Sequence, residues 1–115
     1  LARQTRDADG AFAALHDWLR SNLARSISVS DMAEKCAMSS RSFSRRYAAS
    51  VGLTPANSLE KMRVDAARNL LIETNLGMKT IATTCGFRDQ EKMRRAFHRH
   101  LRTSPSSYQS MFQDA

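Results

Sequence analysis

The chain has few of the residues that break helices or cross-link small proteins: two cysteines, two prolines and four glycines among 115 residues. The cysteines, Cys36 and Cys85, form no Cys-x-x-Cys pair and occupy the same position in the two copies of a repeat described below. Equivalent positions in separate modules are not expected within disulfide reach. We therefore expect two free, partly buried thiols and a reducing, cytoplasmic environment.

Long apolar runs and alternating patterns are also missing. No run of 18 apolar residues and no basic-then-apolar leader is present, so we expect neither a membrane span nor a signal peptide. Apolar residues do not alternate with period two, which argues against a β-sheet. Aromatic residues make up 7% of the chain, too few to stack the bases of a single-stranded nucleic acid.

Patterns typical of catalysis or metal binding are missing as well. The histidines His16, His98 and His100 are scattered, and the last two are expected on different faces of one helix, solvated or facing phosphate. No metal-ligand cluster, glycine-rich phosphate loop or nucleophile–base pair is visible. We therefore predict a chain that is not an enzyme and has no cofactor or metal site.

Acidic residues are outnumbered, with 11 Asp and Glu against 18 Lys and Arg, for a net charge of +7 and a pI of about 10.3. The excess is concentrated in two windows, residues 35–59 and 88–102. The first window carries four basic residues and no acid, namely Lys35, Arg41, Arg45 and Arg46. A charge gathered in this way predicts a polyanionic partner rather than a general solubility charge.

The two basic windows belong to two copies of one motif. Met32–Pro55 and Ile81–Pro105 align at an offset of 49 residues before a turn and of 50 residues after it. The matching pairs are Met32 with Ile81, Ala33 with Ala82, Cys36 with Cys85, Met38 with Phe87, Phe43 with Met93, Arg45 with Arg95, Tyr47 with Phe97, and Thr54-Pro55 with Ser104-Pro105. Each copy predicts a short helix, a tight turn and an arginine-rich second helix. This is the layout of a helix-turn-helix, whose second helix enters the DNA major groove.

Apolar residues recur at intervals of three and four, which predicts an all-α fold of seven helices. The first helix is expected over about Gly10–Asn22. Ser28 and Asp31 predict a capping box at the start of the next helix, because a serine and an acid three residues apart can exchange hydrogen bonds with the backbone. Ser39 is expected to cap the second helix of the first copy, and Gly52 to end it in the left-handed conformation.

Thr54 and Pro55 predict the N-cap and first residue of a connector helix that runs to about Glu73. Its two apolar stripes, Leu59, Met62, Ala66 and Leu70 on one side and Val64, Ala67 and Leu71 on another, predict burial between the two repeats. About 19 residues would span ~28 Å. That length would place the two recognition helices about one DNA turn, ~34 Å, apart. Ser104-Pro105 is expected to start a last short helix.

The inward-facing residues of the two recognition helices leave a polar face on each. Phe43 and Tyr47 are expected inward in the first copy, and Met93, Phe97 and Leu101 in the second. Arginine pairs with guanine, glutamine with adenine and glutamate with cytosine, while serine accepts several bases. The predicted base-reading residues are Ser40, Arg41, Ser44, Arg45, Gln90, Glu91, Arg94 and Arg95. The predicted phosphate contacts, which position the protein without reading sequence, are Lys35, Arg46, Lys79, Arg99 and Arg102.

Glu91 has a second interpretation that the sequence leaves open. Glu91 and Arg95 are four residues apart on one helix, so they could form a surface ion pair with no role in reading bases. Two other function classes also stay open for the chain: a nucleic-acid binder without sequence preference, and a basic helical module that binds acidic protein partners.

The runs MAEKCAMSSRSFSRRY, LEKMRVDAARNLL and IATTCGFRDQEKMRRAFHRHLRTSPSSY resemble the C-terminal DNA-binding domain of AraC-family transcription regulators. The resemblance covers about residues 10–112 and implies two helix-turn-helix lobes joined by one long helix. The implied boundaries are a linker over 1–9 from a missing N-terminal domain, a first lobe over 10–53, a connector over 55–73, a second lobe over 78–112 and a tail over 113–115. The phrases SRRY and MRRAF resemble a subgroup with a DJ-1/glutaminase-like N-terminal domain.

The resemblance further implies a sequence-specific activator that binds double-stranded DNA and RNA polymerase, with an effector ligand sensed only by the missing N-terminal domain. The family's base-reading positions fall on the eight residues already selected. Three positions depart from the family pattern. Arg88 replaces a small polar cap, so the second recognition helix is expected to be capped either weakly or by Asp89. Met93 replaces an aromatic residue, and Arg102 replaces the glycine that closes this helix.

Overall fold

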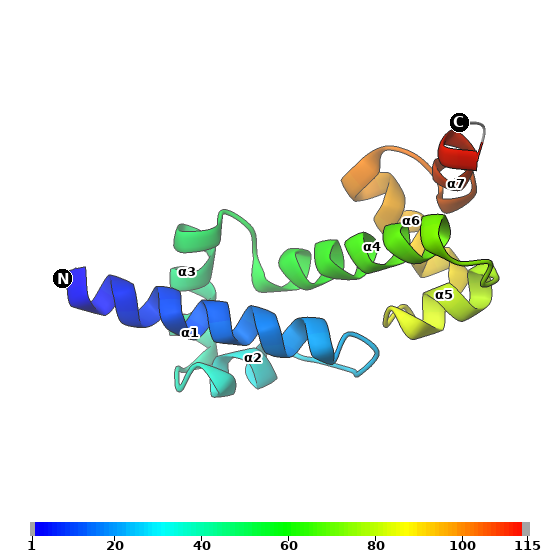
Figure 1. Ribbon diagram of the computed structural model, residues 1–115. Helices are drawn as coiled ribbons and strands as arrows, with labels where there is room; N and C mark the ends of the chain where they lie inside the picture. Colours follow the sequence, from blue (N-terminus) through cyan, green and yellow to red (C-terminus); the bar gives the residue numbers. More distant parts are fainter. Residues whose placement is uncertain (1, 114–115) are drawn as a thin grey trace. The chain divides into compact units, whose positions relative to one another are not determined.

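The computed structural model describes residues 2–113, with side chains from Gly10 onward. Seven α-helices and no strand occur over this range, which confirms the predicted fold class (Figure 1). The helices are α1 (Ala2–Ser21), α2 (Val29–Lys35), α3 (Ser40–Val51), α4 (Pro55–Glu73), α5 (Met78–Thr84), α6 (Gln90–Leu101) and α7 (Pro105–Gln113). The chain forms two compact units. Unit 1 takes the chain up to Asn22 and then Ser26–Leu59, and unit 2 takes Leu23–Arg25 and the chain from Glu60 onward.

The first and last helices extend beyond the predicted bounds. α1 begins at Ala2 rather than at Gly10, so the predicted linker is helical over the residues that the structure describes. Ala2, Arg3 and Gln4 favour helix and no proline interrupts them, so the helix extends beyond the apolar stripe that revealed it. At the other end α7 includes Gln113. The rest of the predicted tail, and the first residue of the predicted linker, lie outside the described residues.

Unit 1 has an aromatic core. Phe12 of α1 meets Phe43 and Tyr47 of α3 edge to face, with ring centroids 5.9 and 5.2 Å apart. Leu15, Leu19, Met32 and Ala33 complete the buried set. The predicted inward face of α3 is therefore confirmed, and its burial fixes which face of α3 stays in solvent.

A chain of hydrogen bonds crosses this core. The Tyr47 hydroxyl donates to Ser58 Oγ at 2.5 Å, and His16 Nε2 lies 2.6 Å from the same hydroxyl. The Tyr47 hydroxyl has one hydrogen, which it donates to Ser58. His16 Nε2 must therefore be the donor to the Tyr47 oxygen. Ser58 is the buried polar residue of the described core, and this chain satisfies it.

His16 predicts a pH dependence of stability. Burial lowers the pKa of His16 below 6.5, Arg20 lowers it further, and Asp17 opposes the shift. The unfolded chain therefore binds more protons than the folded chain, so the free energy of unfolding falls as the pH drops through about 6.5. Urea titrations at about pH 7.5 and 5.5 should show a smaller loss for His16→Gln than for the unmodified chain. Equal losses would contradict this role, since the other histidines are common to both proteins.

The core of unit 2 gathers residues of four helices. Val64, Ala67 and Leu71 of α4 pack with buried residues of α5, α6 and α7, namely Ile81, Ala82, Met93, Ala96, Phe97 and Tyr108. Ala66 and Leu70 pack against the same cluster. Members of both predicted stripes of α4 therefore border this one core. α4 joins the two units along its length, because its first residues, through Leu59, belong to unit 1 and the rest to unit 2.

Arg63 of α4 fixes the segment Leu23–Arg25 within unit 2. Its Nε donates to the Leu23 carbonyl at 3.1 Å and a terminal nitrogen donates to the Arg25 carbonyl at 2.9 Å. Gly86 lies against the same carbonyl: a Cβ at this glycine would be 1.8 Å from the Leu23 oxygen. The Leu23 backbone and the Arg63 guanidinium thus occupy the position that a Cβ at Gly86 would take.

The two helix-turn-helix turns differ by one residue, which explains the change of offset between the repeats. The first turn runs over residues 36–39 and the second over 85–89. Ala37 and Gly86 occupy equivalent positions and both have positive φ, 54° and 94°. Cys36 and Cys85 precede them as buried, free thiols where the first helix ends, as predicted.

Within residues 2–113 no helix is long and apolar enough to cross a membrane.

Arg102 ends α6 at the position where the resemblance implies a glycine. Its φ of 59° is left-handed, as is the φ of 84° at Gly52, which ends α3. Because Gly adopts this conformation without strain, Arg102→Gly should raise the free energy of unfolding by about 0.5–1 kcal/mol. Arg102→Ala is the control in urea denaturation, since it removes the same side chain and keeps the Cβ. An equal effect of both variants would mean that the backbone strain is negligible.

Candidate nucleic-acid interface

α3 is positioned by its caps and by its aromatic residues. The Ser39 hydroxyl accepts from the Ser42 backbone N–H at 3.2 Å, and Gly52 ends the helix with its N–H on the Ala48 carbonyl. Phe43 and Tyr47 are fully buried, so the opposite side of α3 faces solvent. Arg41 and Arg45 lie on that side, exposed, and make no ion pair with any residue that the structure describes.

The exposed side of α3 contains a hollow that the sequence reading did not find. It is lined by Ser42, Arg45, Arg46 and Ala49. These positions are spaced i, i+3, i+4 and i+7, so they follow one helical face, and this spacing was the available signal. Ser44, which was predicted to read bases, is partly buried, whereas Ser42 is exposed. Ser42 therefore joins the candidate contacts of α3.

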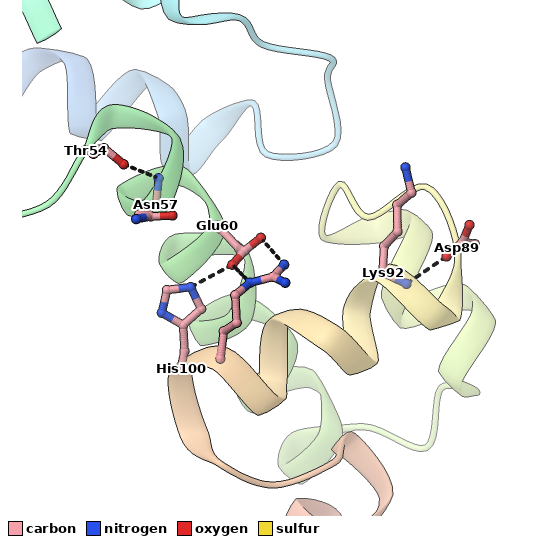
Figure 2. A network of polar contacts seen from close by, with 7 residues as sticks. Thr54, Asn57, Glu60, Asp89, Lys92 and His100 are labelled. Atoms are coloured by element: carbon pink, nitrogen blue, oxygen red, sulfur yellow. Dashed lines mark hydrogen bonds and ion pairs between the residues drawn. The ribbon is translucent and has the colours of Figure 1, made fainter.

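α6 repeats this arrangement with a different cap. The Asp89 carboxylate accepts from the Lys92 backbone N–H at 2.8 Å (Figure 2), so Asp89 caps the helix as predicted. Met93, Ala96 and Phe97 are buried, which leaves the opposite side of α6 in solvent. The four predicted base-reading residues of this helix are all exposed there: Gln90, Glu91, Arg94 and Arg95.

Glu91 binds both neighbouring arginines. Its two oxygens accept from Arg94 at 2.6 and 2.9 Å, and one of them also accepts from Arg95 at 3.1 Å. The ion pair with Arg95 that the spacing allowed is thus present, together with a closer one that the sequence reading omitted. The Arg94 guanidinium, followed by that of Arg95, lowers the pKa of Glu91 to about 2. Glu91 is therefore a carboxylate at any pH near neutrality.

The predicted phosphate contacts fall into two groups. Arg46, Lys79 and Arg102 are exposed and make no ion pair within the described part of the chain. Lys35 lies over the Trp18 ring, 4.6 Å from its centroid, and Arg99 donates two hydrogen bonds to Glu60 at 2.7 and 2.9 Å. These two cations are already engaged within their own units.

Glu60 was not singled out from sequence, because its partners are about 40 residues away. It accepts from Arg99 and lies 2.9 Å from His100 Nε2 (Figure 2). Arg99 is the main cause that lowers the pKa of Glu60, and His100 adds to it. His100 was predicted to be solvated or to face phosphate; it is instead mostly buried against Glu60.

Residues 32–111 match the family of helix-turn-helix domains. The structure is similar to the crystal structure of the DNA-binding domain of AdpA, a global transcriptional factor, in complex with a target DNA. The TM-score is 0.84 and the identity 30%, over 89% of this chain and 92% of that one. An AraC-type regulator from Chromobacterium violaceum shares the fold, with a TM-score of 0.80 and 20% identity over 97% and 96% of the two chains. The chain belongs to the AraC-type helix-turn-helix family.

Relatives of this AraC-type domain are transcription regulators. The HTH-type transcriptional regulator Rv1931c of Mycobacterium tuberculosis is 39% identical over 84 residues, which are 73% of this chain and 32% of the relative. The HTH-type transcriptional activator RhaS of Yersinia pestis is 29% identical over 104 residues, 90% of this chain and 38% of the relative. The chain thus spans about a third of the length of these relatives. The described residues of this AraC-type domain hold no cluster of metal-ligating side chains.

Proposed function

We propose that this AraC-type domain binds double-stranded DNA sequence-specifically, with α3 and α6 in successive major grooves. The observation that carries the proposal is the repeated exposure of an arginine face: each recognition helix buries its apolar side and presents Arg45 or Arg95 outward. A helix that is fixed on one side and basic on the other fits the major groove, where arginine finds the paired acceptors of guanine.

Two kinds of contact carry the binding. Arg46, Lys79 and Arg102 neutralise phosphates, with release of counterions, and supply affinity without sequence preference. One short motif is read from α3 by Ser40, Arg41, Ser42, Ser44 and Arg45. The second is read from α6 by Gln90, Glu91, Arg94 and Arg95. The 30% identical AdpA domain was solved with a target DNA, which supports this mode of binding.

The full-length protein is proposed to be a bacterial, cytoplasmic transcription activator. Support comes from RhaS, a relative named as an activator. Activation requires a contact with RNA polymerase, and regulation requires an effector bound by the part of the protein beyond this domain. Both partners belong to the proposal for the whole protein.

The test is selection of bound duplexes from a random-sequence pool at about 150 mM salt, close to physiological ionic strength. Enrichment of two short motifs centred about one helical turn, ~10 base pairs, apart is expected. Binding without enrichment would replace the proposal with non-specific nucleic-acid binding. The absence of any salt-sensitive binding would favour a basic module that binds acidic proteins.

A further inference from the structure

The two recognition helices differ in whether an acidic residue of the same helix pairs with their arginines. α3 carries Arg41, Arg45 and Arg46 and has no acidic residue in its sequence, SRSFSRRYAASV. α6 carries Arg94 and Arg95, and Glu91 engages both of them. The guanidinium groups of α3 can therefore contact DNA without breaking an ion pair. Those of Arg94 and Arg95 must first leave the Glu91 carboxylate.

We propose that Glu91 is a positioning and specificity-determining residue that withholds Arg94 and Arg95 from phosphates, so that α6 penalises wrong sequences in a way that α3 does not. The inference rests on the proposed function and deepens it. It assigns unequal roles to two helices that the repeat makes equivalent.

The geometry of the Glu91 cluster supports this role. Arg94 binds both carboxylate oxygens, at 2.6 and 2.9 Å, and Arg95 shares one of them at 3.1 Å. An arginine turned toward a phosphate therefore loses its charge-assisted bonds and leaves a bare carboxylate beside the DNA backbone. A correct base pair replaces the lost hydrogen bonds on both sides. Guanine offers two acceptors to the arginine, and the cytosine amino group donates to Glu91.

A wrong sequence offers neither compensation. On such a duplex the arginines either stay on Glu91 and add no phosphate contact, or leave it and expose its charge to the phosphates. Both outcomes weaken binding to a duplex that lacks the motif. Specificity is a difference between affinities, so a residue that penalises wrong sequences raises it without any gain at the right one. A surface ion pair with a merely structural role would leave the ratio of the two affinities unchanged.

Glu91→Gln tests the inference, with Glu73→Gln as the matched control. Both substitutions remove one negative charge from an exposed position of unit 2, and Glu73 makes no ion pair within the described residues. Dissociation constants for the duplex selected by the unmodified chain and for a random duplex are measured over a range of salt concentrations.

Glu91→Gln is expected to tighten binding to random DNA by about fivefold to tenfold. On random DNA, a plot of log affinity against log salt concentration should also become steeper. The slope should change by about one unit for each arginine that newly contacts a phosphate. Binding to the selected duplex should not tighten, so the specificity ratio falls by the same factor of about five to ten, while Glu73→Gln leaves the ratio unchanged. If the two variants behave alike on both duplexes, the inference is overturned and the proposed function stands. If the unmodified chain binds no duplex, both fail.

Discussion

Gly86→Ala is expected to lower the free energy of unfolding by about 3 kcal/mol or more, because strain and overpacking coincide at this glycine. Its φ of 94° is costly for any residue with a Cβ. The added methyl group would also lie 1.8 Å from the Leu23 carbonyl oxygen and 2.6 Å from Arg63 Nε. Relief requires that the backbone of Leu23–Arg25 move, and this movement breaks both hydrogen bonds of Arg63. Urea denaturation followed by circular dichroism measures the loss.

Two glycines of the same chain separate the causes. Gly52 has a φ of 84° but nothing within 4 Å of an added Cβ, so Gly52→Ala should cost only the backbone strain, about 1–2 kcal/mol. Gly10 is helical and also has open space, so Gly10→Ala should stabilise the chain by about 1 kcal/mol. If Gly86→Ala lowers the free energy of unfolding no more than Gly52→Ala does, the close contact with Leu23 does not contribute to the loss.

Arg45→Ala should weaken binding to the selected duplex by about 1–3 kcal/mol, or fivefold to 150-fold in the dissociation constant. Arg45 lies on the exposed side of α3 and forms no ion pair with an acid among the described side chains, so it can interact fully with DNA. Alanine favours helix and the side chain contributes no core contact, so the fold should be retained. Fluorescence anisotropy with a labelled duplex gives the dissociation constants.

Random DNA and one other arginine serve as controls for this variant. Binding to a random duplex should weaken much less, because a base contact is lost only where the base is right. Arg20→Ala, which removes the same charge from α1, should affect both duplexes equally and weakly. Equal losses on both duplexes from Arg45→Ala would reduce Arg45 to a phosphate contact.

The local features of the fold could be read from the sequence because their causes lie within four residues. Ser28 with Asp31 forms the predicted capping box, with bonds of 2.8 and 3.0 Å. Thr54 accepts from the Asn57 N–H ahead of Pro55, and Asp89 takes over the cap where Arg88 cannot. The buried faces of both recognition helices followed from helical spacing. These inferences needed no knowledge of which helices meet.

Tertiary partners could not be read in this way. Arg99 looked like a phosphate contact because its partner, Glu60, is 39 residues away on another helix. Arg63 carried no signal at all, since its acceptors are backbone carbonyls whose position only the fold defines. Two apolar sides of α4 suggested different neighbours, yet Ala66 and Leu70 of one stripe pack against the same core as Val64, Ala67 and Leu71 of the other.

The two buried cysteines give each unit its own chemical reporter. Cys36 belongs to unit 1 and Cys85 to unit 2, and both are free and buried. Burial raises the pKa of each thiol, so both stay protonated and unreactive while their unit is folded. Pulse alkylation of the two native thiols under increasing urea, read by mass spectrometry, would therefore follow the opening of each unit separately. No cysteine has to be introduced for this measurement.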